Sequence, residues 1–148
     1  MLEKMEKINL IDKKVLDFGC GSGILSIAAK QLGAKRVSAI EIDELAINSA
    51  KENIKTSKLS DIDVSHTSIE NLSETSQYDV VLANISSNII INFSESIYSR
   101  LNKTGLLLCS GILSSNIEVT LKKLERVGFL ISDSITQEEW CCLELKVA

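Results

Sequence analysis

The feature that most constrains this 148-residue chain is an apolar segment that runs directly into three glycines and then into a helix. Residues 15–18 predict a buried strand, which is followed by Gly19, Gly21 and Gly23. Glycine suits such a turn because its missing Cβ permits unusual backbone angles and close approach of a ligand. The helix predicted over residues 22–32 presents unpaired N–H groups and a positive dipole end to that ligand. A nucleotide-like cofactor is the usual occupant of such a turn.

The spacing of the glycines distinguishes between two classes of cofactor. A dinucleotide-binding loop has the pattern G-x-G-x-x-G, whereas this loop reads G-x-G-x-G with Asp17 two positions before its first glycine. The acidic arrangement resembles motif I of the class I S-adenosylmethionine methyltransferases. Their cofactor carries no phosphate, so we expect the Asp17 carboxylate to be tolerated and to face the cofactor's cationic end. A pyrophosphate would be repelled by it.

Composition sets modest limits on the remaining possibilities. The length predicts one domain over residues 1–148. A formal net charge of −4 provides no basic field, so we expect no direct nucleic-acid partner. No apolar run approaches about 18 residues, which argues against a membrane partner. Four cysteines without a C-x-x-C pair suggest reduced thiols in a cytoplasmic protein, and a single histidine argues against a metal site.

Strand-like and helix-like segments alternate along the chain, which predicts an α/β fold with a mainly parallel sheet. The predicted strands are 15–18, 35–42, 62–66, 78–83, 105–110, 129–135 and 140–147, and the predicted helices are 22–32, 44–55, 89–101 and 115–127. Asp43 is expected to cap the second helix. The last two strands are too close for a helical crossover, so we expect an antiparallel hairpin. Five parallel strands plus a terminal hairpin, with helices on both faces, is the class I methyltransferase pattern.

Four positions bear on chemistry. Glu41 ends the second strand about 20 residues past the glycine loop, where related folds place a carboxylate on ribose hydroxyls. Taken alone, Glu41 would be interpreted as a solvated charge at a strand end. Together with the glycine loop, its position favours the ribose role. Asn84 lies at the strand edge that lines the ligand crevice, and spacing leaves open whether it accepts a substrate N–H or caps a turn. Gly111 is explained by turn chemistry alone. His66, in the loop where an adenine would lie, is assigned no catalytic role.

Together these residues resemble the PrmA-type family, the methyltransferases of large-subunit ribosomal protein L11. The most selective matching segments are Ala83-Asn84-Ile85, Ser110-Gly111-Ile112-Leu113 and Glu138-Glu139-Trp140. The glycine loop is common to many methyltransferases and says little about the substrate. Nearly the whole chain aligns with the family's catalytic domain. The resemblance implies a Rossmann-like fold, S-adenosyl-L-methionine as cofactor, and N-methylation of lysine and N-terminal amines of ribosomal protein L11.

The resemblance also implies roles for individual residues. Asn84 and the Ile85 carbonyl would accept N–H hydrogens of the substrate amine and orient its lone pair, without a strong general base. The cofactor-binding residues that it implies are Asp17, Gly19, Cys20, Gly21, Gly23, Glu41, Ile42, Ser68 and Asn84.

The sequence departs from the family's pattern in several places. Family members carry an N-terminal substrate-recognition domain and a Phe-Gly-Thr-Gly-x-His segment that covers the cofactor, and we expect this chain to be the catalytic domain without them. Asn84-Ile85-Ser86 replaces the usual Asn-Ile-Leu, residues 103–105 lack the usual Pro-Gly, and Glu41 stands where Asp is commoner. Two alternatives therefore stay open, namely a methyltransferase acting on a small molecule or RNA, and a truncated, non-catalytic cofactor-binding remnant.

Overall fold

A computed structural model describes residues 1–148, which form one seven-stranded sheet in the order β3-β2-β1-β4-β5-β7-β6. The strands are β1 (Lys14–Phe18), β2 (Arg36–Glu41), β3 (Ile62–His66), β4 (Tyr78–Asn84), β5 (Leu101–Leu113), β6 (Phe129–Gln137) and β7 (Trp140–Val147). Strands β1 to β5 pair in parallel, whereas β7 is antiparallel to both of its neighbours. The predicted mainly parallel sheet with a C-terminal antiparallel hairpin is therefore confirmed.

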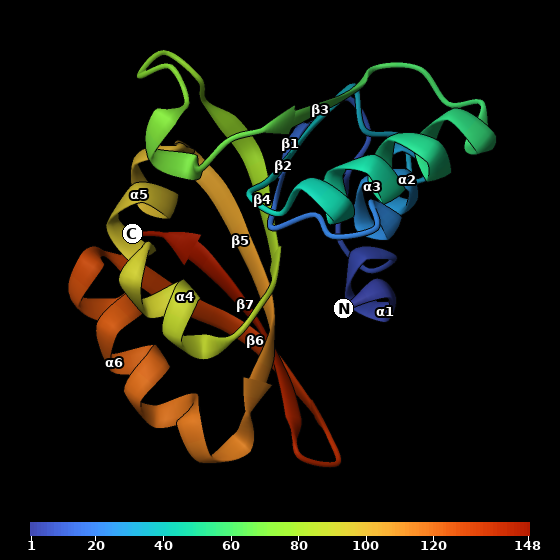
Figure 1. Ribbon diagram of the computed structural model, residues 1–148. Helices are drawn as coiled ribbons and strands as arrows, with labels where there is room; N and C mark the ends of the chain where they lie inside the picture. The colour runs from blue at the N-terminus through green and yellow to red at the C-terminus, as the bar shows by residue number, and fades with distance from the viewer.

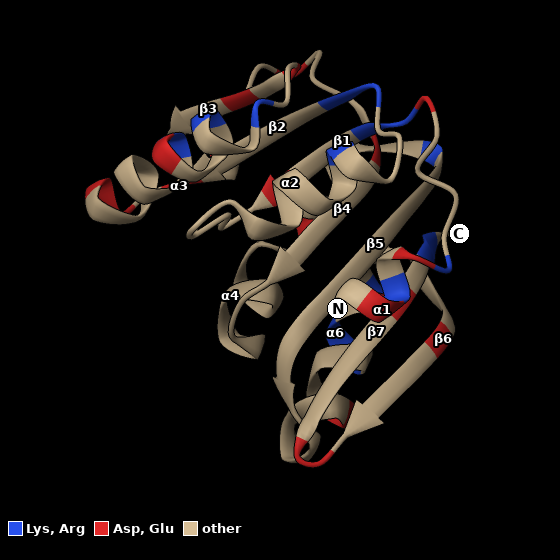
Figure 2. Ribbon diagram, turned by 90° about the vertical axis from the view of Figure 1, so that its right-hand side faces the viewer, with Lys and Arg blue, Asp and Glu red and all other residues tan.

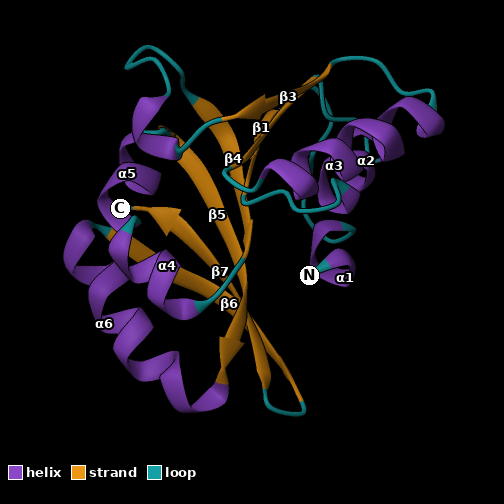
Figure 3. Cartoon of the chain, viewed as in Figure 1, coloured by secondary structure: helices purple, strands orange, loops and turns teal.

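Helices cover both faces of the sheet (Figures 1 and 3). On one side lie α1 (Leu2–Met5), α2 (Ile24–Gln31) and α3 (Glu44–Ser57), and on the other lie α4 (Ser87–Asn92), α5 (Ser94–Ser99) and α6 (Ile117–Val127). Two 3₁₀ turns, η1 (Ile69–Asn71) and η2 (Ser114–Asn116), complete the chain. Each face has its own apolar cluster. The central strand β4 is accordingly apolar on both faces, as a parallel strand buried between two layers must be.

The two largest errors in the predicted boundaries both lie between β4 and β5. The single helix expected over 89–101 is broken at Phe93, whose ψ of 12° is outside the helical range. Two contacts favour the break: the Phe93 ring packs edge-on against Phe18 at 5.7 Å, and the Ser94 hydroxyl donates to the Ile91 carbonyl at 2.8 Å. Strand β5 begins at Leu101 rather than at 105, because buried Leu101 already pairs with β4.

The short helix α1 lies against the β5–β7 part of the sheet, beside α2 (Figure 2). Its Lys4 is 2% exposed and forms ion pairs with Asp133 of β6 and, at 3.1 Å, with Glu144 of β7. These two carboxylates fix α1 to the terminal hairpin, so the hairpin and the start of the chain form one wall of the molecule. No helix reaches the length and apolar character that a membrane crossing needs, and all four cysteines are free thiols.

Candidate cofactor and acceptor site

The glycine loop has the backbone conformation that its sequence predicts. Gly19, Gly21 and Gly23 have φ angles of +71°, +53° and +80°, in the left-handed region that favours glycine. The N–H groups of Gly19 and of the next residue both donate to the Ile40 carbonyl at 3.0 Å, which holds the loop beside the end of β2. A Cβ at Gly21 would meet no atom within 4 Å, so the loop is open to a ligand at that point.

The Glu41 carboxylate joins the ends of β1 and β2. Its Oε2 accepts from the Gly21 N–H at 3.0 Å, and its Oε1 accepts from the N–H groups of Ile42 (2.8 Å) and Asp43 (3.1 Å). An ionised carboxylate offers about four lone-pair positions, so one acceptor position remains on Oε2. The neighbouring Ile42 side chain is 71% exposed, which leaves an uncovered apolar surface beside this carboxylate.

Asp17 lies beneath the glycine loop rather than at its surface. Its side chain is 1% exposed, Oδ2 accepts from the Ser26 hydroxyl at 2.6 Å, and Oδ1 has no partner. Burial raises the pKa of Asp17 to about 6, the hydrogen bonds from Ser26 lower it, and the nearby Glu41 charge raises it further. We expected the Asp17 carboxylate to face the cofactor's cationic end, but in the structure it is buried beneath the loop, so any effect on a bound cation acts from below the loop.

The raised pKa of Asp17 predicts a pH-dependent stability. The folded chain holds the Asp17 proton to a higher pH than the unfolded chain, so stability falls as pH rises from about 4 to about 6. Above that window the free energy of unfolding is lower by about 3 kcal/mol, because the buried Asp17 is then ionised. Asp17→Asn should therefore leave the free energy of unfolding almost unchanged at pH 4 and raise it by roughly 1–3 kcal/mol at pH 8. Urea unfolding of both proteins across this range is the measurement, and an identical pH slope in the variant would assign the slope to another group.

Three segments that are distant in the sequence meet at Ile85, directly after β4. The Ile85 N–H donates to the Ser110 carbonyl at 3.2 Å, which continues the β4–β5 ladder past Asn84. A Cβ on Gly19 would lie 2.7 Å from Ile85 Cγ2, and a Cβ on Gly111 would lie 2.7 Å from the Ile85 carbonyl oxygen. Ile85 is therefore enclosed between the glycine loop and β5, and its carbonyl accepts no hydrogen bond within the chain.

Gly111 has a role that turn chemistry did not suggest. Its φ of +80° and its approach to the Ile85 carbonyl leave no room for a side chain unless the backbone shifts, so Gly111 sets how closely β5 approaches the end of β4. In the sequence, the signal was a glycine at the end of a strand neighbouring the one that carries Asn84.

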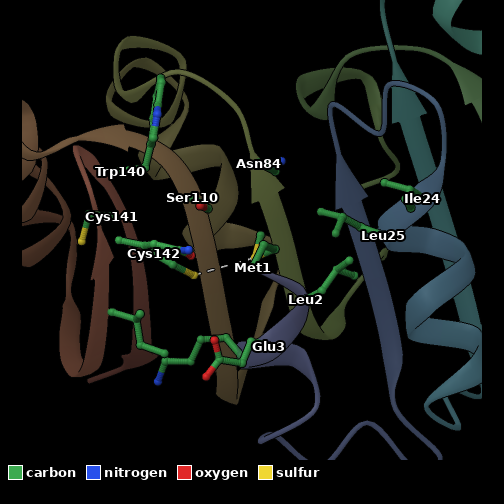
Figure 4. A pocket seen from close by; sticks show the side chains of 13 residues that line it. Met1, Leu2, Glu3, Ile24, Leu25, Asn84, Ser110, Trp140, Cys141 and Cys142 are labelled. Atoms are coloured by element: carbon green, nitrogen blue, oxygen red, sulfur yellow. Dashed lines mark hydrogen bonds between the residues drawn. The ribbon is translucent and has the colours of Figure 1, made fainter.

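A hollow of about 440 Å³ opens beside Asn84 (Figure 4). Asn84 and Ser110 lie at the carboxyl ends of β4 and β5, and Trp140 rises from the terminal hairpin on the same side. The other residues that line the hollow come from α1, the start of α2 and the hairpin: Met1, Leu2, Glu3, Lys4, Ile24, Leu25, Ile135, Gln137, Cys141 and Cys142. Sequence reasoning noted Trp140 only as a family marker and did not place the hairpin or α1 at the site.

The remaining predicted residues divide into two groups. Ser68 precedes η1 at the carboxyl end of β3, on the same edge of the sheet as Glu41 and Asn84. Cys20 is buried: it is 6% exposed, packs against small residues of β2 and α3, and burial raises the pKa of its thiol to about 12. Gly23 allows the start of α2 to pack closely against α3, because a Cβ at this position would lie 3.3 Å from a side chain of α3.

Two flanking residues support the site without entering it. Asp43 caps α3 as predicted, accepting from the Ala46 N–H at 2.8 Å. The exposed His66 ring bonds through Nε2 with the Ile42 carbonyl at 2.8 Å, which ties the loop after β3 to the loop after β2.

Known proteins are similar to this chain in sequence and in overall fold. The family model described as "Ribosomal protein L11 methyltransferase (PrmA)" matches residues 1–148. The ribosomal protein L11 methyltransferases of Staphylococcus haemolyticus and Prochlorococcus marinus are 41% and 40% identical to the chain, over 89% and 99% of its length. The crystal structure of a ribosomal protein L11 methylase from Lactobacillus delbrueckii subsp. bulgaricus superposes with a TM-score of 0.94 at 28% identity, covering 99% of this chain and 76% of that one.

Each of these matches covers most of this chain but a smaller share of the related protein. The chain spans 42% and 50% of the length of the two curated relatives. Its own length is matched throughout, and its fold is the Rossmann-like fold of the class I methyltransferases. The chain belongs to the ribosomal protein L11 methyltransferase (PrmA) family.

Proposed function

We propose that the chain is the catalytic domain of an S-adenosylmethionine-dependent protein N-methyltransferase that acts on ribosomal protein L11. The observation that carries the proposal is the meeting of three segments at Ile85: the acidic glycine loop, the Asn84 strand end and the Gly111 segment of β5. The candidate cofactor loop therefore lies next to the groups that would accept hydrogen bonds from the substrate amine, at one edge of the sheet. Ligands of open α/β sheets bind at that edge.

The residues at this edge fit S-adenosylmethionine. When bound, the cofactor supplies an electrophilic methyl group on a sulfonium. The free position on Glu41 Oε2 accepts a ribose hydroxyl, and Gly21 allows the ligand to approach the loop backbone. The exposed Ile42 side chain and Ser68 are the contacts on the adenine side. A carboxylate below the loop and another beside it disfavour a pyrophosphate, which argues against a dinucleotide.

The acceptor side of the site suits a neutral amine. A lysine amine, with a pKa near 10.4, is protonated in water at neutral pH. Transfer from water into the partly apolar hollow lowers that pKa and favours the form with a free lone pair. The Asn84 side-chain carbonyl and the free Ile85 carbonyl accept the amine hydrogens and aim the lone pair toward the glycine loop. Rate enhancement then comes mainly from proximity and orientation.

Substrate and compartment follow from family membership and chemistry. The relatives are named for ribosomal protein L11, which is accordingly the proposed substrate and partner. Four free thiols, three of them in the sheet, suit a reducing compartment, and we place the protein in the cytoplasm.

Cofactor identity is tested by calorimetric titration of the chain with S-adenosylhomocysteine and with NAD. We expect S-adenosylhomocysteine to bind more tightly. Glu41→Ala should weaken that binding by about 1–3 kcal/mol, because it removes the charge-assisted hydrogen bond to the ribose and the bond that Glu41 accepts from the Gly21 N–H of the loop. Glu41→Asp keeps the carboxylate and should retain most of the affinity.

Glu44→Ala is the matched control, since Glu44 is an exposed acid three residues further on. It should bind S-adenosylhomocysteine like the parent chain. Tighter binding of NAD than of S-adenosylhomocysteine would exclude the proposed cofactor, and equal affinities of Glu41→Ala and the parent would exclude the ribose role of Glu41.

A further inference from the structure

Arg100, at the C-terminal end of α5, is a buried cation without a carboxylate partner. It is 7% exposed, and none of the ion pairs in the structure includes it. Its guanidinium instead donates to two successive main-chain carbonyls, those of Leu72 (2.9 Å) and Ser73 (2.5 Å). Its Nε is buried and has no partner.

This arrangement is costly if its only purpose is stability. Burying a cation without a counter-ion has a desolvation penalty that two neutral carbonyls offset only in part. An apolar side chain of similar length would fill the same space without that penalty. What a guanidinium adds is geometry, because its planar fork fixes two acceptors at once, which a lysine cannot do. The position of the Leu72–Ser73 backbone is therefore what Arg100 determines.

The segment that Arg100 holds begins at the candidate adenine contact. Ser68 precedes η1, and Leu72 follows it. The start of this segment is attached to the site, because the Thr67 N–H donates to the Glu41 carbonyl at 3.0 Å. Its middle is anchored by Ile69, which is fully buried in the main apolar cluster. Arg100 provides the third attachment, at its far end.

The chain just beyond has little structure of its own to replace that attachment. Between Ser73 and the start of β4, one main-chain hydrogen bond joins the residues to one another, from the Ser76 N–H to the Ser73 carbonyl. The Gln77 side chain donates to the Ser99 carbonyl at 2.9 Å, which again ties this loop to the end of α5. Without Arg100, the end of η1 would lose the two hydrogen bonds that hold its backbone directly, and only Ile69 and the Gln77 bond would remain on either side of it.

We propose that Arg100 is a positioning residue for the adenosine end of the cofactor, acting through Leu72 and Ser73 to hold Ser68 at the edge beside Glu41. The inference rests on the proposed function, because it takes S-adenosylmethionine as the ligand of that edge. It assigns a binding role to a side chain that does not line the site.

Arg100→Lys tests this role, because lysine keeps the charge and the aliphatic stem but loses the two-pronged fork. Calorimetry with S-adenosylhomocysteine and with 5′-methylthioadenosine should show about five- to tenfold weaker binding of both, since both carry the adenosine end. Each titration is made well below the variant's own unfolding midpoint. Arg126→Lys, which alters an exposed arginine of α6, is the matched control and should bind like the parent.

Two further readouts separate positioning from stability. Amide hydrogen exchange should become faster in residues 69–73 of Arg100→Lys and stay unchanged in β1 and β2. Ser68→Ala should weaken binding in the parent chain but much less in the Arg100→Lys background, because the two residues act as one unit.

The outcomes distinguish this inference from the function on which it rests. If the parent chain does not bind S-adenosylhomocysteine, the proposed function fails and the role of Arg100 fails with it. If the parent binds and Arg100→Lys binds within twofold of it, only the role of Arg100 is overturned. Fully additive losses in the double variant would overturn it as well.

Discussion

Asn84→Ala should lower the rate of methyl transfer by about 10²-fold or more while leaving cofactor affinity within about twofold. Asn84 is exposed at the carboxyl end of β4 and lines the hollow, and β1 lies between its strand and β2, the strand that ends at Glu41. Loss of its side-chain carbonyl removes an acceptor that orients the amine, and because the Asn84 side chain is exposed, little packing is lost with it. Such a change lowers turnover without changing ground-state cofactor binding. The measurement is single-turnover methylation of ribosomal protein L11 by mass spectrometry, with calorimetry of S-adenosylhomocysteine binding alongside.

Asn88→Ala provides the matched control for this experiment. Asn88 is a second exposed asparagine four residues further on, in α4, and its loss should leave both the rate and the affinity unchanged. Both variants should unfold within about 0.5 kcal/mol of the parent, because exposed polar substitutions away from special contacts cost little. Methylation by Asn84→Ala at the parent's rate would remove Asn84 from the mechanism.

Those parts of the fold that depend on local sequence are the parts that could be predicted. The alternation of strands and helices, the Asp43 cap and the terminal hairpin each follow from a few neighbouring residues, and all three are confirmed. The break between α4 and α5 could not be predicted, because the ring of Phe93 packs against Phe18, 75 positions earlier in the chain. Non-local contacts of this kind override helix propensity.

The candidate site shows the same division between local and distant causes. The backbone angles of the glycine loop follow from its own residues, whereas the depth of Asp17 is set by α2 packing over it. Glu41 lies at the expected strand end, but its bond to Gly21 depends on how two loops meet. The roles of Asn84 and the Ile85 carbonyl remain predictions; the structure supports them because Asn84 lines the hollow and Ile85 follows it directly, with a carbonyl that accepts no hydrogen bond within the chain.

Gly111 illustrates most directly what a sequence pattern leaves out, since its importance depends on the Ile85 carbonyl across the sheet. Gly111→Ala should lower the free energy of unfolding by about 2–4 kcal/mol. Two causes add: an alanine is strained at a φ of +80°, and its Cβ would lie 2.7 Å from the Ile85 oxygen, a contact that real Cβ atoms do not make. Relief requires β5 and the end of β4 to separate, which moves the Ile85 carbonyl away from the acceptor position. We therefore expect methyl transfer to be lost even where the variant is fully folded.

Gly21→Ala separates these two causes by urea unfolding. Gly21 also has a positive φ, +53°, but a Cβ there meets nothing within 4 Å, so only the backbone strain of about 1 kcal/mol applies. The difference between the two variants measures the contact with Ile85. Equal destabilisation by Gly21→Ala and Gly111→Ala would show that backbone strain alone matters, and that β5 does not fix the position of the Ile85 carbonyl. A larger loss for Gly111→Ala, with methyl transfer abolished at a temperature where it remains folded, would make this glycine part of the acceptor site.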